Sequence, residues 1–254
     1  MTQLKILCDT TLKQQPLQAS KLSDDQKQAV KAGTLFTLQS YAPESDHVKV
    51  TFSDQSLQGK NTWYVYQKHS AIMNNGGIIF PPAVKLSVPY FDQLDNSDEP
   101  YGTCNVTSIS MCLAYLGAAR KHPGIRFPDE LYQYCIDYGL DRHDPYALAK
   151  IVQAYGFKDN FKETASIEEV KEWLIQGNPA VVHGYFTASG HIVVIIGYNS
   201  SGFVVNDPYG ELMYNAGQSY YDTYSSGSGL TYSYNLISNT CCCGNEFWVH
   251  FISR

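Results

Sequence analysis

The sequence has few basic side chains and no long apolar run. Lys and Arg together contribute 18 of the 254 residues, and the formal net charge is −6. These basic residues do not cluster into a surface that would displace counterions from phosphates, so we expect no nucleic-acid partner. No segment approaches the roughly eighteen consecutive apolar residues of a membrane span, so no membrane partner is expected either. The apolar fraction of 44% is that of a globular protein.

Cysteine occurs without the spacing of a disulfide framework or a zinc site. The count of seven is odd, and Cys241, Cys242 and Cys243 are consecutive. Three neighbouring thiols on a regular strand cannot all point at one metal, and the sequence has no Cys-x-x-Cys pair. We therefore expect free thiols, no metal and a reducing compartment.

The first residues are too short and too quickly polar for a signal peptide. Lys5 already interrupts the apolar residues of the segment 1–8. We therefore expect the chain to be cytoplasmic on synthesis, and any action on a cell wall would follow its release. The sequence leaves the oligomeric state open.

Residues 1–78 have the pattern of a small all-β domain. Alternating apolar and β-branched residues predict strands over 4–7, 34–38, 47–52 and 62–66. A capping box of Ser23 and Gln26 predicts a short helical turn that closes at Gly33. The segment resembles a bacterial SH3-like domain, which implies a small barrel that binds cell-wall peptides or covers its neighbour. The Asn-Gly stretch 74–77 is the predicted linker.

Residues 79–254 combine helices and strands in the order of an α+β domain. A helix is predicted from Cys104 to Gly117, because apolar residues recur along it at every third or fourth position. Further helices, each ended by a glycine, are predicted over 129–138, 144–155 and 166–176. Strands are predicted over 84–90, 180–186, 191–198, 203–207 and 246–252. We therefore expect a helical half followed by an antiparallel sheet.

Cys104 stands where the first of these helices begins. Unpaired backbone N–H groups and the helix dipole stabilise a thiolate at that position, and the thiolate is the reactive form of a cysteine nucleophile. Catalysis also needs a base within hydrogen-bond reach and a group that orients the base. His191 opens an apolar strand after a flexible turn, and Asp207 closes the next strand. His183, on the preceding strand, is the second candidate for the base.

The register of one hairpin decides whether His191 and Asp207 meet. A loop that contains all four turn residues, 199–202, would place the two side chains on opposite faces of the sheet. A three-residue loop with Gly202 in a left-handed conformation, or an equivalent bulge, returns them to one face. They are then diagonal neighbours about 7–8 Å apart at Cβ. We predict that loop or such a bulge.

Three motifs resemble the papain-like cysteine peptidases of family 39, the bacteriocin-processing type and its free-standing relatives. They are Gln93 with 103–108, then 189–192, and then 206–210. The resemblance covers roughly residues 84–254. It implies a papain-like fold in which Cys104 is the nucleophile and His191 is the general base and later the acid. It also implies that Asp207 orients His191 and that Gln93 donates a hydrogen bond to the oxyanion.

One departure from the family pattern affects the acyl pocket. Many relatives carry Gly-Pro after the nucleophile, where this chain has Asn105 and Val106. The larger side chains could narrow the pocket, but they remove no catalytic group.

The resemblance implies a cysteine hydrolase that cleaves amide bonds through a thioester, without metal or organic cofactor. Because a small barrel precedes the catalytic type, the favoured substrate is the stem peptide of peptidoglycan, as for a phage endolysin. Three alternatives stay open: a protein-processing cysteine protease, acyl transfer to an amine, and a catalytically inactive binding module.

Two further segments have more than one interpretation. The acidic run 92–99 offers oxygen ligands for calcium, or it is a solvated loop. The tyrosine-rich segment 214–234 lines a groove for an extended or glycan-bearing ligand, or it is a long ordered loop.

Overall fold

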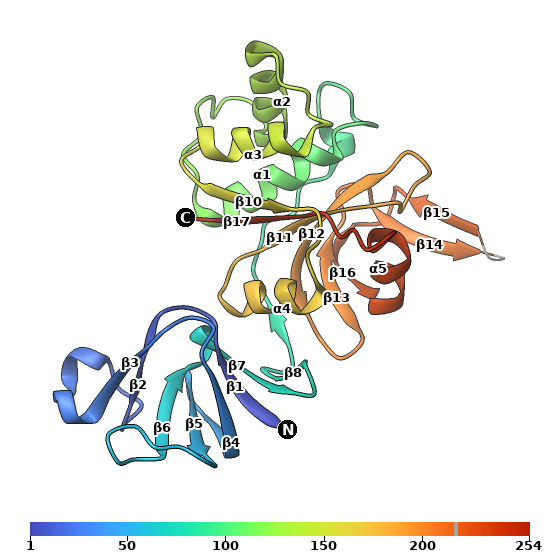
Figure 1. The fold of residues 1–254 in the computed structure, drawn as a ribbon. Coiled ribbons are helices and arrows are strands. Elements are labelled where there is room, and N and C mark those ends of the chain that lie inside the picture. Colours follow the sequence, from blue (N-terminus) through green and yellow to red (C-terminus); the bar gives the residue numbers. More distant parts are fainter. Residues whose placement is uncertain (216–217) are drawn as a thin grey trace. The chain divides into compact units, whose positions relative to one another are not determined.

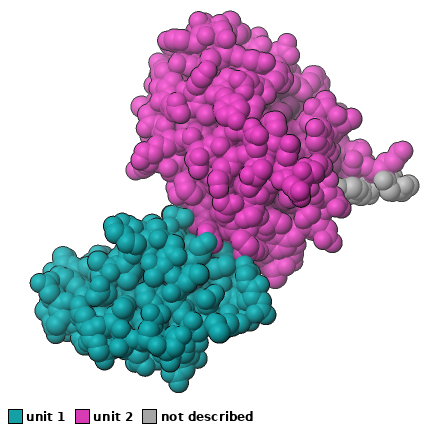
Figure 2. All heavy atoms as spheres, in the orientation of Figure 1, with its two compact units in different colours: residues 1–84, 175–177 teal, residues 85–174, 178–254 magenta. Residues whose placement is uncertain are grey.

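The chain divides into two compact units, which Figure 2 distinguishes by colour. The computed structural model describes residues 1–215 and 218–254. Unit 1 contains residues 1–84 and 175–177, and unit 2 contains residues 85–174 and 178–254. Among the helices in these described ranges, none combines the length and apolar composition that a membrane crossing needs.

Unit 1 is built from antiparallel strands (Figure 1). Their bounds are β1 Thr2–Ile6, β2 Thr10–Lys13, β3 Lys27–Val30, β4 Leu35–Glu44, β5 His47–Phe52, β6 Thr62–Tyr66, β7 Ser70–Asn74 and β8 Gly77–Phe80. Apolar side chains on the inward face of these strands form its core, with Trp63 and Val65 fully buried. The four strands predicted from alternation are present, because that alternation reflects one buried face.

The strands of unit 1 pair in the order β3-β2-β6-β5-β4-β1-β7-β8. No ladder between β3 and β8 is found in the described part of the chain, so the predicted closed SH3-like barrel is not shown. The capping box at Ser23 is present and opens a short 3₁₀ turn, Asp24–Gln26. That turn does not extend to Gly33, because β3 follows it directly. Gly33, with φ of +81°, lies in the turn before β4.

The predicted linker at 74–77 is instead a hairpin turn. Asn74 pairs with Gly77, and the turn joins β7 to β8. Asn75 and Gly76 between them have φ of +49° and +84°, as both central residues of a type I′ turn require. The Asn-Gly pair was therefore a hairpin signal rather than a linker signal.

Helices α1 to α4 of unit 2 begin and end close to the predicted residues, and α5 is an addition. Their bounds are α1 Cys104–Leu116, α2 Phe127–Tyr138, α3 Pro145–Ala154, α4 Ile167–Ile175 and α5 Tyr234–Cys241. Gly117 caps α1 in the left-handed conformation, with φ of +82°, which a residue with a side chain rarely adopts. Helix α5 was not predicted, because its polar sequence lacks a clear apolar stripe. Cys241 is the last residue of this helix and does not lie in a strand.

In the ranges that the structure describes, the main sheet of unit 2 has seven strands in the order β10-β17-β11-β12-β13-β16, with β9 paired to β12. Their bounds are β9 Val84–Lys85, β10 Lys158–Lys162, β11 Ala180–Gly184, β12 His191–Tyr198, β13 Gly202–Asn206, β16 Ser228–Ser233 and β17 Val249–Ser253. A separate hairpin joins β14 Glu211–Asn215 to β15 Gln218–Asp222. The predicted strand 84–90 is thus reduced to two residues.

The core of unit 2 lies between three helices and one face of this sheet (Figure 1). Side chains of α1, α2 and α3 pack there against residues of β11, β12 and β17. Val106 and Ile109 of α1 are fully buried, as are Val181 and Val194 of the sheet. This packing fixes the first turn of α1 against β12, and the candidate site lies at that junction.

Candidate active site

Helix α1 presents Cys104 at its first residue. Two hydrogen bonds hold this end of the helix: Asn105 Nδ2 donates to the backbone oxygen of Arg142 at 2.9 Å, and Ser108 Oγ donates to that of Ile192 at 3.1 Å. The second bond links the first turns of α1 to β12. The departure at Asn105 and Val106 therefore leaves Cys104 at the helix start.

Cys104 and His191 line the same cavity, and each side chain shifts the pKa of the other. Cys104 is partly exposed, whereas His191 is buried. Burial opposes ionisation of the thiol, but the hydrogen bond and charge of His191 and the backbone N–H of Ile192 hold the pKa of Cys104 below its usual value. Burial also opposes the imidazolium, but Asp207 and the contact with Cys104 raise the pKa of His191 to about 10. Both shifts favour a thiolate–imidazolium pair.

A bulge in β12 brings His191 and Asp207 to the same face of the sheet. Tyr198 pairs with Phe203, so the loop contains all four turn residues and the predicted three-residue loop is wrong. The register then shifts between Ile195 and Gly197. This equivalent bulge restores the parity that the sequence required, because the extra residue moves the rest of β12 by one position.

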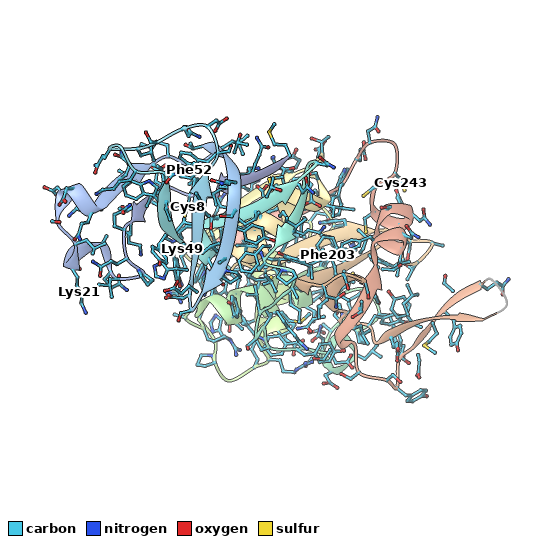
Figure 3. The ribbon with its side chains drawn as sticks, turned by 90° about the horizontal axis from the view of Figure 1, so that it is seen from below. Cys8, Lys21, Lys49, Phe52, Phe203 and Cys243 are labelled. Atoms are coloured by element: carbon cyan, nitrogen blue, oxygen red, sulfur yellow. The ribbon has the colours of Figure 1, made fainter. Side chains whose placement is uncertain are left out.

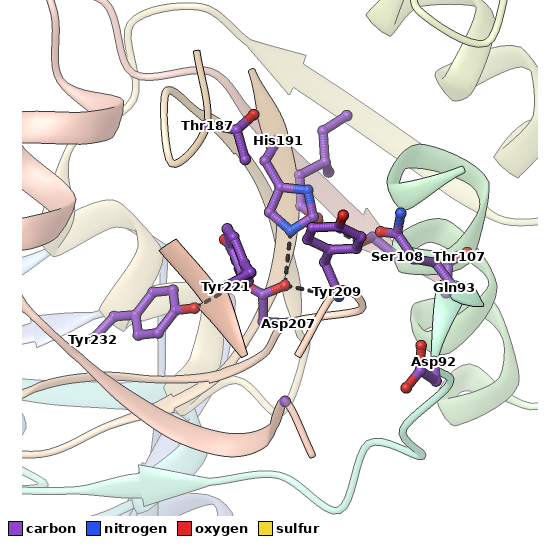
Figure 4. A network of polar contacts seen from close by, with 12 residues as sticks. Asp92, Gln93, Thr107, Ser108, Thr187, His191, Asp207, Tyr209, Tyr221 and Tyr232 are labelled. Atoms are coloured by element: carbon purple, nitrogen blue, oxygen red, sulfur yellow. Dashed lines mark hydrogen bonds and ion pairs between the residues drawn. The ribbon is translucent and has the colours of Figure 1, made fainter. Parts of the chain in front are cut away.

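Asp207 is fully buried, and within the described residues its side-chain oxygens accept four hydrogen bonds (Figure 4). His191 Nε2 donates to Oδ1 at 2.7 Å, and the backbone N–H of Tyr209 donates to the same oxygen at 3.0 Å. The hydroxyls of Tyr221 and Tyr232 donate to Oδ2 at 2.9 and 2.6 Å. Four donors thus satisfy both oxygens of a carboxyl group that is buried.

Sequence reasoning did not identify Tyr221 and Tyr232 as site residues. They lie on β15 and β16, within the tyrosine-rich segment 214–234, of which residues 216 and 217 are outside the described ranges. Burial and the charge of Asp207 raise the pKa of both hydroxyls, so they remain protonated donors. The only sequence signal was the abundance of tyrosine, which does not say which ring reaches the carboxylate.

Gln93 lies in a short 3₁₀ turn and is buried. Its Nε2 donates to the backbone oxygen of Pro100 at 2.8 Å, and its backbone N–H donates to that of Pro208 at 2.8 Å. The backbone contact fixes Gln93 directly beside the segment that carries Asp207. The second hydrogen of Nε2 is the one that an oxyanion would use.

A cavity of about 300 Å³ opens beside Cys104 and His191. Its other walls come from β11, from the end of α5 and from the segment before β17. They include His183, Cys241, Cys243 and Glu246. Cys241 is buried, whereas Cys243, labelled in Figure 3, is exposed. Within the described ranges, no group of three His, Cys, Asp or Glu side chains is placed to hold a metal ion.

The hydrogen bond of His183, the second candidate for the base, joins it to a separate set of polar side chains rather than to Asp207. Its Nε2 lies 3.0 Å from Nε2 of His250, whose Nδ1 lies 2.7 Å from Oδ2 of Asp159. His250 and Asp159 are fully enclosed. Sequence reasoning missed this pair, because the two residues lie 91 positions apart on strands that only the fold brings together.

A thiolate at a helix start, an imidazolium beside it and a buried carboxylate behind the ring form the arrangement of a thiol-dependent hydrolase. Comparison with protein families agrees with this class. Residues 85–241, more than half of the chain, match the Peptidase_C39 like family, and the chain belongs to that family. The protein is therefore a cysteine peptidase.

Two solved structures are similar to this chain at 17% sequence identity each. One is a double glycine motif protease from an AMS/PCAT transporter in complex with the leader peptide, with a TM-score of 0.42 over 66% of this chain and 91% of that one. The other is a C39-like peptidase from Bacillus anthracis, with a TM-score of 0.38 over 68% of this chain and 98% of that one. Comparison with curated proteins gave no match.

Proposed function

We propose that the protein hydrolyses peptide bonds through a thioester formed on Cys104. The observation that carries this proposal is the arrangement of the three side chains: Cys104 and His191 line one cavity, and His191 Nε2 donates to Asp207 Oδ1 at 2.7 Å. Because Nε2 of His191 faces Asp207, Nδ1 is the ring nitrogen left for the thiol. One imidazole thus contacts the nucleophile and its orienting carboxylate at the same time.

In the proposed reaction, the Cys104 thiolate attacks the carbonyl carbon of the substrate and a tetrahedral oxyanion forms. The backbone N–H of Cys104 belongs to the first turn of α1, whose N–H groups lack intrahelical partners, and it stabilises the oxyanion together with Gln93 Nε2. The His191 imidazolium protonates the leaving amine, and the thioester remains. His191 then accepts a proton from the water that hydrolyses the thioester.

Two peptide substrates are proposed, in this order. The first is the stem peptide of peptidoglycan, which the separate all-β unit 1 favours as a wall-binding neighbour. The second is an unstructured polypeptide, on which a processing peptidase would act. Both fit the same chemistry, because the reacting group is an amide in each.

One experiment tests both the function and the order of substrates. Purified wild-type protein and the variant Cys104→Ala are each incubated with peptidoglycan and with casein. Mass spectrometry should find new amine and carboxyl ends in peptidoglycan with wild type only. Casein cleavage without wall cleavage would contradict the first substrate. Products from Cys104→Ala at the wild-type rate would contradict the assigned nucleophile. The free energy of unfolding of this variant should lie within about 1 kcal/mol of the wild-type value, because a partly exposed thiol contributes little packing.

Labelling with iodoacetamide distinguishes the enzyme from a binding module that keeps only the fold. Cys104 should react near neutral pH faster than Cys8, a partly exposed thiol of unit 1 that serves as the matched control. Burial and the neighbouring Asp9 raise the pKa of Cys8, so it stays a thiol there. Equal labelling of the two would favour the binding module.

A further inference from the structure

Three polar side chains form a row across neighbouring strands of the unit 2 sheet, separate from Cys104, His191 and Asp207. Asp159 is on β10, His250 on β17 and His183 on β11, and these strands are consecutive in the sheet. The register makes each residue a diagonal neighbour of the next: Phe161 pairs with His250, and His250 pairs with Val181. The row therefore leads from a fully enclosed carboxylate towards the cavity that His183 lines.

The acceptor character of Asp159 sets the direction of these hydrogen bonds. Its carboxylate accepts from His250 Nδ1, so that nitrogen carries a hydrogen. A neutral imidazole has one hydrogen, and in that form of His250 its Nε2 accepts from His183 Nε2. The hydrogen of His183 is then on Nε2, and Nδ1 is left as a lone pair. Burial and the neighbouring His250 lower the pKa of His183 to about 3, so the ring stays neutral.

His183 lines the cavity, and Nδ1 is the ring nitrogen that the contact with His250 leaves for a ligand there. Nε2 is directed at the fully buried His250, and Nδ1 has no hydrogen-bond partner among residues 1–215 and 218–254. The ring itself is held by aromatic neighbours, with ring centroids 5.9 Å from Trp248 and 6.0 Å from Phe161. A fixed ring with a free acceptor atom is preorganised for a ligand.

The same cavity is lined by Cys104 and His191, so a substrate bound to the nucleophile is within reach of His183. Glu246, which also lines it, is a second acceptor on that wall: its Oε2 accepts from Trp248 Nε1 at 3.1 Å. This wall therefore offers lone pairs. A peptide substrate supplies complementary donors in its backbone N–H groups.

We propose that His183, supported by His250 and Asp159, forms a subsite of the catalytic cavity that accepts a hydrogen bond from a backbone N–H of the substrate next to the cleaved bond. The inference rests on the proposed function, since it concerns the same cavity. His183 is thereby a specificity-determining residue that contacts substrate, and His250 and Asp159 are positioning residues that act through it.

Two conservative variants separate contact with substrate from support of the sheet. The amide of Gln occupies roughly the position of Nε2 in an imidazole, so His183→Gln keeps a polar group towards His250 and loses the acceptor in the cavity. The shorter Asn places its amide near the position of Nδ1, so His183→Asn keeps a polar group in the cavity and loses the contact with His250. A purely structural role predicts the opposite ranking of the two variants.

The test uses a peptide that the wild-type protein cleaves, selected from a library, and a series in which each backbone amide flanking the cleaved bond becomes an ester. An ester removes one N–H donor without lengthening the chain. At one position the ester should lower kcat/KM of wild type about tenfold, as expected for one hydrogen bond. At that position it should lower kcat/KM of His183→Gln by less than about twofold, because the acceptor is already absent.

Failure of the inference is distinguishable from failure of the proposed function. The subsite is overturned if the ester lowers kcat/KM of wild type and of His183→Gln by the same factor at every position. It is also overturned if His183→Gln retains full kcat/KM while His183→Asn does not. The alkylation rate of Cys104 should be equal in wild type and His183→Gln, because His191 and Asp207 control the thiolate. If wild type cleaves no peptide in the library, the proposed function fails and the subsite with it.

Discussion

The sheet of unit 2 carries two carboxylate–imidazole pairs that share a geometry and differ in their surroundings. The distance from ring nitrogen to carboxylate oxygen is 2.7 Å in both, for His191 with Asp207 and for His250 with Asp159. All four side chains are at most 4% exposed. His191 uses Nε2 for its carboxylate and turns Nδ1 to a thiol, whereas His250 uses Nδ1 and turns Nε2 to another imidazole.

The two carboxylates also differ in how many donors they have. Asp207 accepts four hydrogen bonds, two of them from tyrosine hydroxyls. Asp159 accepts one on Oδ2, and its buried Oδ1 has no partner in the part of the chain that the structure describes. A buried carboxylate–imidazole pair therefore does not by itself define a catalytic site. The site is defined by the group at the ring nitrogen that faces away from the carboxylate and by the donors around the carboxylate.

The largest contrast is expected from the same substitution at the two histidines. A Gln amide replaces Nε2, so His191→Gln keeps the donor to Asp207 but loses the contact with Cys104. We expect kcat to fall about 10³-fold with the free energy of unfolding within about 1 kcal/mol of wild type. His250→Gln loses the donor to Asp159, so its free energy of unfolding should fall by about 3 kcal/mol.

Kinetics with a cleaved peptide and urea unfolding measure both effects of this substitution. In His250→Gln, kcat/KM per folded enzyme should stay within about tenfold of wild type, because His250 affects the reaction only through His183. If His191→Gln were the less stable variant, or His250→Gln the less active one, the assignment of the two pairs would be reversed.

The pH profile should respond to one carboxylate and not to the other. Asp207 favours the imidazolium and helps to raise the pKa of His191 to about 10, against the effect of burial. In Asp207→Asn that charge is lost and burial remains, so the alkaline limb of kcat/KM should move to lower pH, by about one unit or more. In Asp159→Asn the limb should not move. Equal shifts in the two variants would contradict the separate roles.

Removal of a tyrosine hydroxyl tests the donors around Asp207. Tyr232→Phe leaves one lone pair of a buried carboxylate without its donor, and we expect the free energy of unfolding to fall by about 2 kcal/mol and kcat by several-fold. Tyr234→Phe is the matched control, because its hydroxyl donates to the backbone oxygen of Asn199 at 2.8 Å. That neutral bond should contribute about 1 kcal/mol and leave kcat unchanged. Equal changes in both variants would argue against a special role for the Asp207 donors.

The smallest effect is expected at the contact between α1 and β12. Ser108→Ala removes the hydrogen bond to the backbone oxygen of Ile192, so the free energy of unfolding should fall by about 1 kcal/mol. Because this bond aligns the helix start with the His191 strand, kcat should fall about two- to fivefold at unchanged KM. Ser110→Ala is the control: its hydroxyl donates within α1, to the backbone oxygen of Thr107. A larger fall of kcat in the control would exclude an alignment role for Ser108.

Local signals in the sequence were sufficient for helices α1 to α4 of unit 2 and for the order of the site residues. The apolar period and the glycine at position 117 fixed α1, and that placed Cys104 at a helix start. The alternation of side chains predicted a three-residue loop or an equivalent bulge, and the structure has the bulge, between Ile195 and Gly197. Which residue bulges depends on packing along the whole strand, and the apolar residues 192–196 look alike in sequence.

In unit 1, local sequence signals predicted some strands but not the topology of the sheet. Alternation identified four of its strands, but the missed strands β2, β3, β7 and β8 decide its topology. The Asn-Gly turn at 75–76 was taken for a linker, although the same residues specify a hairpin when strands flank them.

The sequence by itself determined that a cysteine at a helix start precedes a histidine and an aspartate on one hairpin, because these features follow from local periods and turns. Only the tertiary structure decided the surroundings of each group: the tyrosine donors on Asp207, the second imidazole on His250, and His183 beside the nucleophile. Contacts between residues tens of positions apart depend on strand order and packing, and neither is encoded in any one segment. For this reason the reactive thiol was visible in the sequence, and the subsite proposed beside it was not.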